Sequence, residues 1–527
     1  LQHCVHKKNL QIRLHMSDKT SDNNKRIAKN TLVLYFRMFI IMAVTLFTSR
    51  MILKALGIED FGIYNVVGGV VSMIGLLNSA MSVSTTRHLT FELGRGDYKK
   101  LREIFSMCFT IYLMLVCLFF VLAETVGLWF VNTHLTIPEN RMAAANWIYQ
   151  FSILSCVISL IANPYNAVLV AHEKMNIYAY ISIADVLLKL AIVYMLPIIP
   201  FDKLSTYGTL MFCVVLFSNL LYISYCTRHY KEAHYNFFWD KSLFTDLLSY
   251  SWWNLFGAAS GLVKGQGLNI LLNMFFTPAV NAARGIAYQI NTAVTQFFTN
   301  FYLAVRPQIT KYYAQNDLEN MFKLVFRSSK LSFYLIFLIS LPIIIETPFI
   351  IKLWLGQIPE YVVSFTRIIV LISAIDSMAS PLMTSCHATG NIRLYQSLVG
   401  TMIMFNIPIS YLLLKYTNCG PNTVFYVSLT ISTIALFTRI WLVKRQIPEF
   451  PAWKFVKKVF LLSLVIGICS SILPIALHLI LEPTILSCCI VIGTSLISTL
   501  TAIYFIGLSK TEKQFVFQVI NKKILHR

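Results

Sequence analysis

Six stretches of this sequence are long enough to cross a lipid bilayer as helices and contain no Asp, Glu, Lys, Arg or His. A bilayer core requires about 20 apolar residues in helical form, and hydrocarbon admits only helices and closed barrels, which satisfy every backbone group. Charged residues make up only 13% of the 527 residues, too few to cover a water-soluble globule of this size. The sequence therefore predicts an all-α polytopic membrane protein. The six stretches are Met142–Ala171, Leu204–Thr227, Gly285–Val305, Leu394–Leu414, Tyr416–Thr438 and Pro483–Ser509.

We expect about fourteen transmembrane helices in total. The loops between them are short, which leaves no room for a sizeable domain outside the membrane. The expected spans lie near residues 30–55, 64–91, 103–130, 142–171, 177–199, 204–227, 246–275, 280–305, 328–353, 362–388, 392–415, 420–441, 455–480 and 484–508.

The basic residues are distributed unevenly between the two sides that these spans define. One side holds 32 of the 44 Lys and Arg residues and the other side holds 5. Cytoplasmic loops of membrane proteins carry such an excess, so the pattern predicts an even number of spans with both termini in the cytoplasm. It also accounts for the formal net charge of +21 without a nucleic acid partner. The basic segments are 1–30, 92–103, 172–177, 227–245, 306–330, 389–393, 439–458 and 509–527.

The first 30 residues are polar and basic, and no signal peptide is visible, because the first apolar run is too long for a signal core. We expect Met16 to be the natural initiator and residues 1–15 to lie outside the natural protein.

The two halves of the chain resemble each other. Asp97 matches Asp317, and Pro164 matches Pro381, at a nearly constant offset. A duplication of six spans gives both copies the same orientation, because six is even. We therefore expect two parallel six-helix lobes related by pseudo-twofold symmetry, plus two C-terminal helices. The expected organisation is a cytoplasmic basic tail at 1–29, an N-lobe at 30–227, a cytoplasmic linker at 228–245, a C-lobe at 246–441, helices 13 and 14 at 442–508, and a basic cytoplasmic tail at 509–527.

No catalytic, cofactor or metal signature is present. The sequence lacks HExxH, Walker A, GxSxG and GxGxxG motifs. The 11 cysteines are scattered without a CxxC pair, so we expect them to be small buried hydrophobic residues. The external loops are nearly free of carboxylates, apart from Glu59 and Asp60, which argues against a membrane glycosyltransferase. We therefore expect a protein that is not an enzyme and that has no cofactor and no metal site.

Basic residues inside the predicted spans indicate function, because each costs roughly 2.5–3.5 kcal/mol at a helix centre. Lys264 lies near the middle of the seventh span, and neither this span nor the eighth contains a carboxylate that would neutralise it. Arg37 and Arg50 lie in the first span, and Arg284 lies near the outer end of the eighth. These four residues are our candidate substrate-binding residues, with snorkelling to the outer interface as the alternative for Arg50 and Arg284. Desolvated Lys and Arg bind phosphate strongly, so the ligand is expected to be anionic.

Acidic residues inside the spans are our candidates for binding a coupling ion, H⁺ or Na⁺. They are Asp185, Glu124 and Asp376. Asp185 and Lys189 are four residues apart on one helix, which favours an intrahelical ion pair over ion coupling.

Two short strings and the span pattern resemble a known family. The strings are LGIEDFGIY at Leu56–Tyr64 and GRGDYKKL at Gly94–Leu101. Together they are similar to the polysaccharide-transporter (Wzx-like flippase) branch of the multidrug/oligosaccharidyl-lipid/polysaccharide (MOP) exporter superfamily, over about residues 30–510. The resemblance implies two six-helix lobes and transport of lipid-linked sugars across the cytoplasmic membrane of bacteria. The fourteen spans are also similar to those of lipid II flippase relatives.

Our sequence-based hypothesis is a flippase for undecaprenyl-diphosphate-linked oligosaccharide in the bacterial inner membrane. The two lobes would alternate in access, and Lys264 with Arg37 and Arg284 would hold the diphosphate. The expected partners are the lipid-linked oligosaccharide, membrane lipids and a coupling ion. The alternatives are a cation-coupled multidrug or metabolite exporter of the same superfamily and, less favoured, a membrane glycosyltransferase or polymerase.

Overall fold

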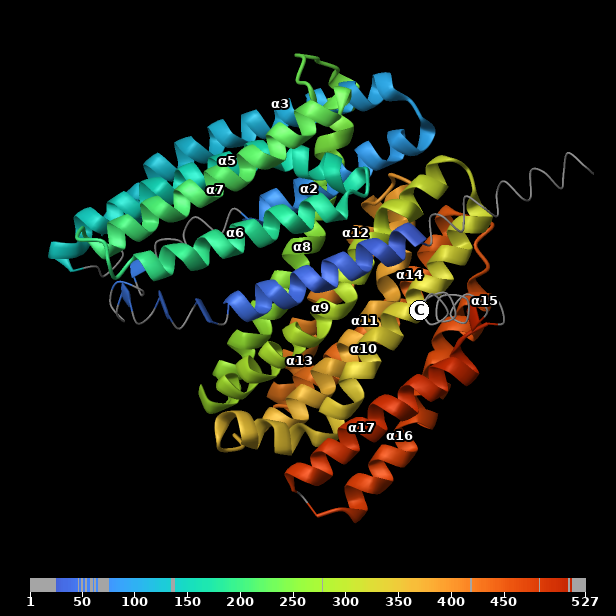
Figure 1. The fold of residues 1–527 in the computed structure, drawn as a ribbon. Coiled ribbons are helices and arrows are strands. Elements are labelled where there is room, and N and C mark those ends of the chain that lie inside the picture. The colour runs from blue at the N-terminus through green and yellow to red at the C-terminus, as the bar shows by residue number, and fades with distance from the viewer. Residues whose placement is uncertain are drawn as a thin grey trace, which may run out of the picture. The chain divides into compact units, whose positions relative to one another are not determined.

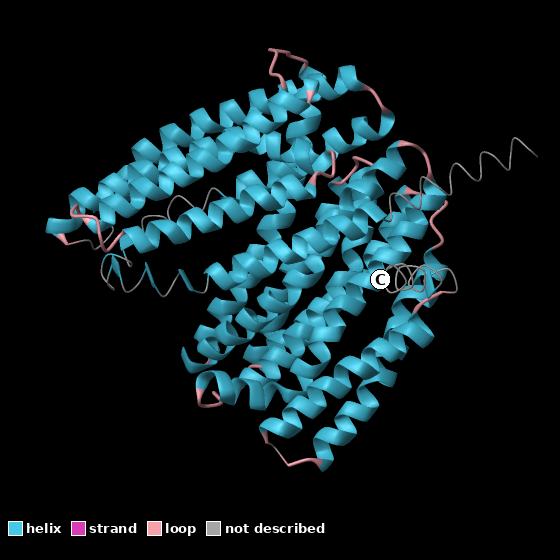
Figure 2. Cartoon of the chain, in the orientation of Figure 1, coloured by secondary structure: helices cyan, strands magenta, loops and turns pink. Residues whose placement is uncertain are grey.

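Every regular element in the described part of the chain is a helix. The computed structural model describes residues 25–45, 47–48, 51–52, 55–56, 60, 63–64, 75–133, 138–276, 278–417, 419–482, 484–509 and 512–513. Figure 1 shows these helices in chain order, and Figure 2 shows helices joined by loops, without a strand among the described residues. Eleven of the described helices are long and apolar enough to cross a membrane. The predicted all-α polytopic fold is confirmed.

Each of the fourteen predicted spans overlaps a described helix, and the span predicted at 142–171 coincides with α5 (Met142–Ala171). Three of these helices do not reach the apolarity of the other eleven, namely α2 (Gly75–Arg95), α8 (Lys241–Phe275) and α9 (Pro278–Ala314). Polar residues in a membrane helix face the interior of the protein or a water-filled cavity in almost every case. The three polar helices are therefore the ones expected to face the interior of the protein or a water-filled cavity.

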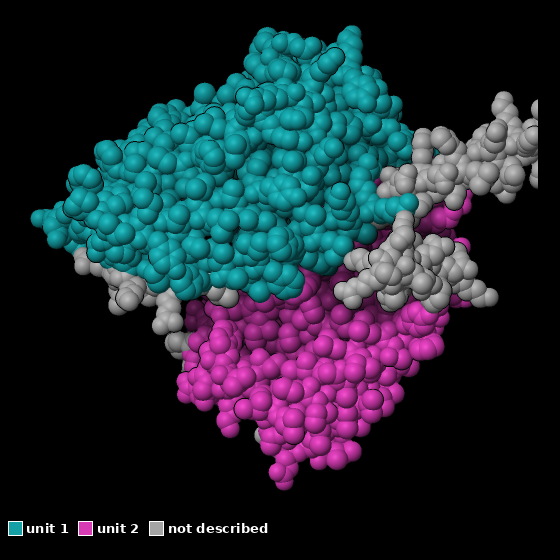
Figure 3. All heavy atoms as spheres, in the orientation of Figure 1, with its two compact units in different colours: residues 1–258, 310–316 teal, residues 259–309, 317–527 magenta. Residues whose placement is uncertain are grey.

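The chain divides into two compact units (Figure 3). The first comprises Leu1–Ala258 with Thr310–Asn316, and the second comprises Ala259–Ile309 with Asp317–Arg527. Helices α8 and α9 each begin in one unit and end in the other.

The first unit is built on α5. Helices α7, α2 and α3 pack against it, and Figure 1 shows α3, α5 and α7 side by side. Gly208 of α7 lies against Ile148 of α5, and a Cβ atom added there would come within 2.9 Å of the Ile148 side chain. Small residues allow such close packing where the hydrophobic effect does not drive helices together. The helices of this unit are an unlabelled helix at Lys25–Thr45, α2, α3 (Tyr98–Leu122), η1 (Ala123–Gly127), α4 (Leu128–Thr133), η2 (Glu139–Arg141), α5, α6 (Met175–Met195), α7 (Lys203–His229), η3 (Lys231–Ala233) and the start of α8.

A buried carboxylate ties three parts of the first unit together. Glu173, in the turn between α5 and α6, has a fully buried side chain. Its oxygens accept hydrogen bonds from Arg26 Nε at 2.8 Å and from Lys311 Nζ at 2.6 Å. These bonds join the helix at Lys25–Thr45, the α5–α6 turn and the last turn of α9.

The second unit is built on α11 (Val362–Ala388), which is buried along most of its length. Helices α10 and α14 pack against α11, and α17 and α16 pack against α10. Phe365 of α11 meets Phe425 of α14 with ring centroids 4.5 Å apart. The remaining helices of this unit are α10 (Leu318–Leu355), α12 (Arg393–Met404), α13 (Asn406–Tyr416), α14 (Thr423–Gln446), α15 (Ala452–Phe455), η4 (Val456–Leu461), α16 (Leu462–Ile480), α17 (Ile485–Ala502) and η5 (Ile503–Gly507).

Helix α10 bends at a buried charge. Its backbone is not helical at Glu346, and Pro348, which lacks an N–H, leaves the carbonyl of Ile344 without its helical donor. Arg367 of α11 donates its Nε to that oxygen at 2.8 Å. Glu346 itself pairs with Nδ1 of His478 on α16 at 2.7 Å. Pro348 places the bend in the sequence. Arg367 satisfies the carbonyl that the bend frees, and His478 pairs with the carboxylate of Glu346.

The predicted repeat is supported by backbone geometry. Asp97 and Asp317 each begin a helix, and each carboxylate accepts a hydrogen bond from the backbone N–H three residues later, at 3.0 and 3.2 Å. Each is preceded by a residue with a left-handed backbone, Gly96 (φ 78°) and Asn316 (φ 57°). Glycine and asparagine are the residues that adopt this conformation most readily. The two halves thus share a turn as well as a pattern of spans.

Arg141 connects the start of α5 to two acidic residues of the first unit. Its Nε donates to Asp60 at 2.8 Å, and its Nη1 donates to Asp202, the N-cap of α7, at 2.7 Å. Burial raises the pKa of Asp202, but hydrogen bonds from Ser205 and Arg141 outweigh it and hold that pKa below its ordinary value. The carboxylate is therefore the favoured form at neutral pH.

We expect Arg141→Ala to lower the free energy of unfolding by about 1–2 kcal/mol at neutral pH, because it removes charge-assisted hydrogen bonds. An aspartate with a lowered pKa stabilises the fold above its unfolded-state pKa, and this stabilisation is lost as the pH falls through the lowered value. The difference from wild type should therefore vanish at acidic pH. Thermal unfolding across pH measures it, with Lys203→Ala as the control, since Lys203 is exposed and forms no ion pair among the described residues. Equal destabilisation by the two variants would contradict this role.

Candidate functional site

Lys264 of α8 belongs to a charged cluster inside the second unit. The carboxylate of Asp376 on α11 attracts its ammonium group electrostatically and the guanidinium of Arg439 on α14 repels it, although Lys264 forms no direct ion pair in the described part of the chain. The carboxylate of the predicted span 7, Asp246, lies at its beginning, far along the helix from Lys264. Folding brings the charge of Asp376 from span 10 within electrostatic reach of Lys264, which sequence spacing does not reveal. Two basic groups and one acid leave the cluster with a net positive charge.

Asp376 is the acidic centre of the cluster. Its Oδ1 lies 3.8 Å from Nη1 of Arg439, and its Oδ2 accepts a hydrogen bond from Ser432 Oγ at 3.4 Å. Its side chain is 44% exposed, whereas that of Arg439 is 12% exposed. The carboxylate is therefore the more accessible charge of this pair, and the guanidinium of Arg439 is largely buried.

Sequence reasoning missed Arg439, because it assigned residues 439–458 to a cytoplasmic segment. The structure places Arg439 inside α14, more than one turn before the helix ends at Gln446. Its Nε donates to the hydroxyl of Tyr395 on α12 at 3.1 Å. The signal lies in the residues that follow, Ile-Trp-Leu-Val, since four apolar residues separate Arg439 from the basic pair that ends the span.

One face of α11 carries polar groups that continue the cluster. Ser373 donates to the side-chain oxygen of Asn291 on α9 at 2.8 Å. Further along α11, the hydroxyl of Tyr302 on α9 donates to the carbonyl of Ser380 at 2.9 Å and contacts the Thr384 hydroxyl. A polar layer therefore joins α9 and α11 on both sides of Asp376.

Glycines of α8 leave space beside Lys264. A Cβ atom added at Gly261 or Gly265 would meet no other atom within 4 Å, whereas one added at Gly267 would overlap the side chain of Ile407 on α13. Gly267 therefore permits close packing of α8 on α13, and the other two glycines border open space one helical turn apart.

Arg284 of α9 is held against α8. Its Nη2 donates to the carbonyl of Gly265 at 2.6 Å and its Nη1 to the side chain of Asn269 at 3.3 Å. The guanidinium also lies 4.6 Å from the ring centroid of Tyr288. Arg284 is thus anchored one residue along α8 from Lys264, in the same unit.

Arg37 lies in the other unit. Its guanidinium lies 4.7 Å from the ring centroid of Tyr178 on α6. The structure therefore does not bring Arg37 together with Lys264 and Arg284 within one compact unit. Arg50 lies outside the described residues.

The acidic candidates of the first unit are engaged locally. Asp185 forms an ion pair with Lys189 at 2.7 Å and accepts a hydrogen bond from Ser218 at 3.0 Å, so the favoured intrahelical pair is present. Glu124 lies in η1 and accepts a hydrogen bond from Gln150 Nε2 at 3.1 Å.

Comparisons with known proteins identify the fold. Residues 34–195 match the family model described as MatE, and no curated protein matches the sequence. A solved structure of an outward-facing multidrug resistance MATE family transporter of the MOP superfamily is similar with a TM-score of 0.70 and 12% identity, over 81% of this chain and 97% of that one.

Two further solved structures agree with this. A MATE protein in complex with MaD3S gives a TM-score of 0.68 at 13% identity, over 80% of this chain and 97% of that one. A MOP superfamily transporter from Pyrococcus furiosus gives a TM-score of 0.65, over 80% of this chain and 96% of that one. That transporter is described as having a binding pocket of reverse polarity, which suggests a different function. The chain is a multi-pass membrane protein with the fold of the MATE transporters of the MOP superfamily.

We expect Asp376→Asn to lower the free energy of unfolding by about 1–3 kcal/mol, because it leaves Lys264 and Arg439 together without a carboxylate. Lys264→Gln in the same background should recover part of the loss, since groups in one cluster are energetically coupled. Thermal unfolding of the purified variants measures both effects. Glu449→Gln, which removes an exposed carboxylate, is the matched control. Stability unchanged by Asp376→Asn would show that the three charges do not act as a unit.

Proposed function

We propose that this chain is an exporter that moves a lipid carrying a diphosphate-linked oligosaccharide across the bacterial inner membrane. Its two compact units would alternate in exposing the substrate to the two sides of the membrane. The observation that carries the proposal is the net positive charge of the cluster formed by Lys264, Asp376 and Arg439. A desolvated cationic group favours a phosphate-bearing ligand over an organic cation.

The surroundings of Lys264 support the proposal. The open space at Gly261 and Gly265 lies on the same helix, one turn apart, and the exposed side of Asp376 admits solvent to the cluster. Arg284 is anchored beside Gly265. In our proposal Lys264 contacts the diphosphate and Arg284 supports it, and Arg37 and Arg50 remain further candidates for binding the substrate.

A coupling ion would supply the energy. Asp376, Asp185 and Glu124 are the proposed sites for H⁺ or Na⁺. We favour Asp376 among these three residues. Its carboxylate is partly exposed and lies beside Arg439, so binding of a substrate would affect it directly. We also propose that both termini are cytoplasmic, from the excess of Lys and Arg on one side.

A second candidate function is a cation-coupled multidrug exporter. It is favoured by the MatE match at residues 34–195 and by the multidrug resistance MATE transporter among the similar structures. The charge of the cluster favours the first candidate function over the second, because a cationic cluster suits an anionic lipid better than an organic cation. The MOP transporter from Pyrococcus furiosus, whose pocket is described as having reverse polarity, provides a precedent for a change of pocket charge within this fold.

We expect Lys264→Gln to reduce translocation of a fluorescent polyprenyl-diphosphate oligosaccharide in proteoliposomes by at least about tenfold. It removes one desolvated charge from the ligand site, and a loss of about 1.4 kcal/mol corresponds to a factor of ten. Translocation is measured as the rate at which the labelled sugar becomes accessible to a quencher outside the vesicles. Lys323→Gln is the matched control, because Lys323 pairs with Glu319 on the exposed surface of α10.

The same vesicles distinguish the alternative. If the protein is a flippase, neither wild-type protein nor the Lys264→Gln variant should export a soluble cationic dye. Efficient dye export by wild type, unaffected or improved by Lys264→Gln, would favour the multidrug exporter and refute the flippase.

A further inference from the structure

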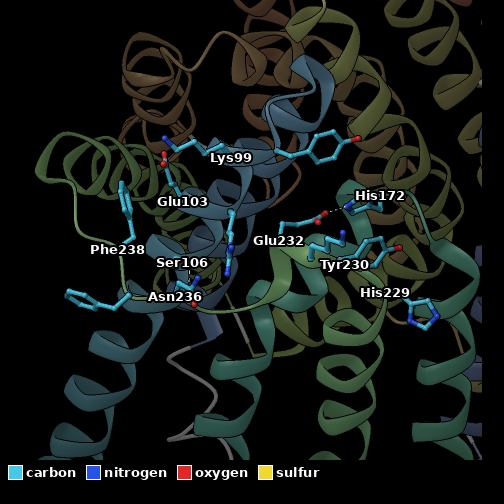
Figure 4. A pocket seen from close by; sticks show the side chains of 13 residues that line it. Lys99, Glu103, Ser106, His172, His229, Tyr230, Glu232, Asn236 and Phe238 are labelled. Atoms are coloured by element: carbon cyan, nitrogen blue, oxygen red, sulfur yellow. Dashed lines mark hydrogen bonds and ion pairs between the residues drawn. The ribbon is translucent and has the colours of Figure 1, made fainter.

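The first unit contains a pocket of about 740 Å³ at one end of its helices. Three helices that are long and apolar enough to cross a membrane end at this pocket: α3 begins at Tyr98, α5 ends at Ala171 and α7 ends at His229. The connection from α7 to α8 closes its remaining side (Figure 4). The pocket therefore lies where the apolar part of the unit meets the headgroup region.

Three cations line the pocket. Lys99 and Arg102 lie on one face of α3, with Glu103 and Ser106 at the following positions of that face, and Lys231 lies in η3. None of the three basic side chains forms an ion pair with a carboxylate in the described part of the chain. With the side-chain amide of Asn236 oriented to satisfy its hydrogen bonds, its oxygen accepts a hydrogen bond from Nη2 of Arg102.

The acidic group deepest in the wall is already engaged. Glu232 is buried, and its Oε1 lies 2.6 Å from Nε2 of His172 (Figure 4). The His172 ring stacks on Tyr230 with centroids 4.1 Å apart. Burial raises the pKa of Glu232, but the hydrogen bond from His172 and a backbone hydrogen bond outweigh it and leave the pKa below its ordinary value. Glu103 is then the one carboxylate of the lining that forms no ion pair within the residues that the structure describes.

Aromatic side chains form the rim. Tyr98 is 67% exposed and Phe237 is 75% exposed. The segment before Phe237 is held on α3, because the backbone N–H of Asn236 donates to Ser106 Oγ at 3.3 Å and the hydroxyls of Tyr235 and Thr110 lie 3.3 Å apart. Exposed aromatic rings at the ends of membrane helices are typical of the headgroup level. They offer an apolar surface beside a cationic pocket.

We propose that this pocket binds the headgroup of an anionic phospholipid. Lys99, Arg102 and Lys231 donate to its phosphate oxygens, and the apolar part of the lipid rests on Phe237. A soluble phosphate ester has the same anionic chemistry, but it would use neither the exposed aromatic rim nor the position at the ends of three membrane helices. Basic pockets between transmembrane helices bind lipid headgroups in this way. The site is in the first unit and does not involve Lys264, so it stands apart from the proposed function.

The test measures the thermal stability of the purified full chain in detergent, titrated with dioctanoyl phosphatidylglycerol, dioctanoyl phosphatidylcholine or glycerol 3-phosphate. A ligand that binds the folded state raises its stability with concentration. We expect a saturable increase with phosphatidylglycerol alone. The double variant Lys99→Gln/Lys231→Gln should raise the half-saturating concentration about tenfold or more, from the contribution of two basic residues to lipid binding.

The matched control is Lys100→Gln/Arg228→Gln. It removes the same charge from the same ends of α3 and α7, but neither residue lines the pocket, so its half-saturating concentration should stay within about twofold of wild type. Equal weakening by both double variants would mean that only the overall charge attracts the lipid, and would overturn the proposal. Stabilisation by glycerol 3-phosphate equal to that by phosphatidylglycerol would assign the pocket to a soluble phosphate instead, and equal stabilisation by phosphatidylcholine would exclude recognition of the anionic headgroup.

Discussion

The cost of placing charge among membrane helices governs what this chain does with its few charged residues. Two acidic residues that cations surround differ in access. Glu173 is sealed in the first unit between Arg26 and Lys311, with no exposed side-chain surface. Asp376 has a partly exposed side chain, lies 3.8 Å from Nη1 of Arg439 and attracts Lys264 electrostatically. The sealed carboxylate connects helices, whereas the partly exposed one remains accessible. This accessibility is one reason for our proposal that the substrate site lies in the second unit.

The fold supplies the surroundings of that site from helices of unequal polarity. Eleven described helices are apolar enough to face lipid, whereas α2, α8 and α9 carry the polar residues that lipid disfavours. Lys264 belongs to α8 and Arg284 to α9. A Cβ atom at Gly261 or Gly265 would meet no other atom within 4 Å, and Gly267 lets α8 pack closely on Ile407 of α13. A polar helix with this pattern both packs and leaves room for a ligand.

Much of the fold could be predicted from the sequence, because hydrocarbon imposes long apolar runs with definite ends. The span at 142–171 was predicted to the residue, and the equivalent turns at Gly96-Asp97 and Asn316-Asp317 follow from local preferences. The site was less predictable. Asp376 reaches Lys264 through tertiary packing, which residue spacing does not encode, and Arg439 was hidden next to a basic loop. The bend of α10 at Glu346 depends on Arg367 from another helix. Apart from Arg439, each miss concerns an interaction between residues distant in the sequence.

The central claim is that a net positive cluster selects an anionic substrate. Its most direct test compares initial transport rates of two lipid-linked oligosaccharides that have the same sugar and the same lipid, one joined by a diphosphate and one by a neutral ether. The account predicts that wild-type protein moves the diphosphate-linked lipid at least about tenfold faster, since a desolvated Lys or Arg contributes at least that much to binding a phosphate. Equal rates for the two substrates would contradict it.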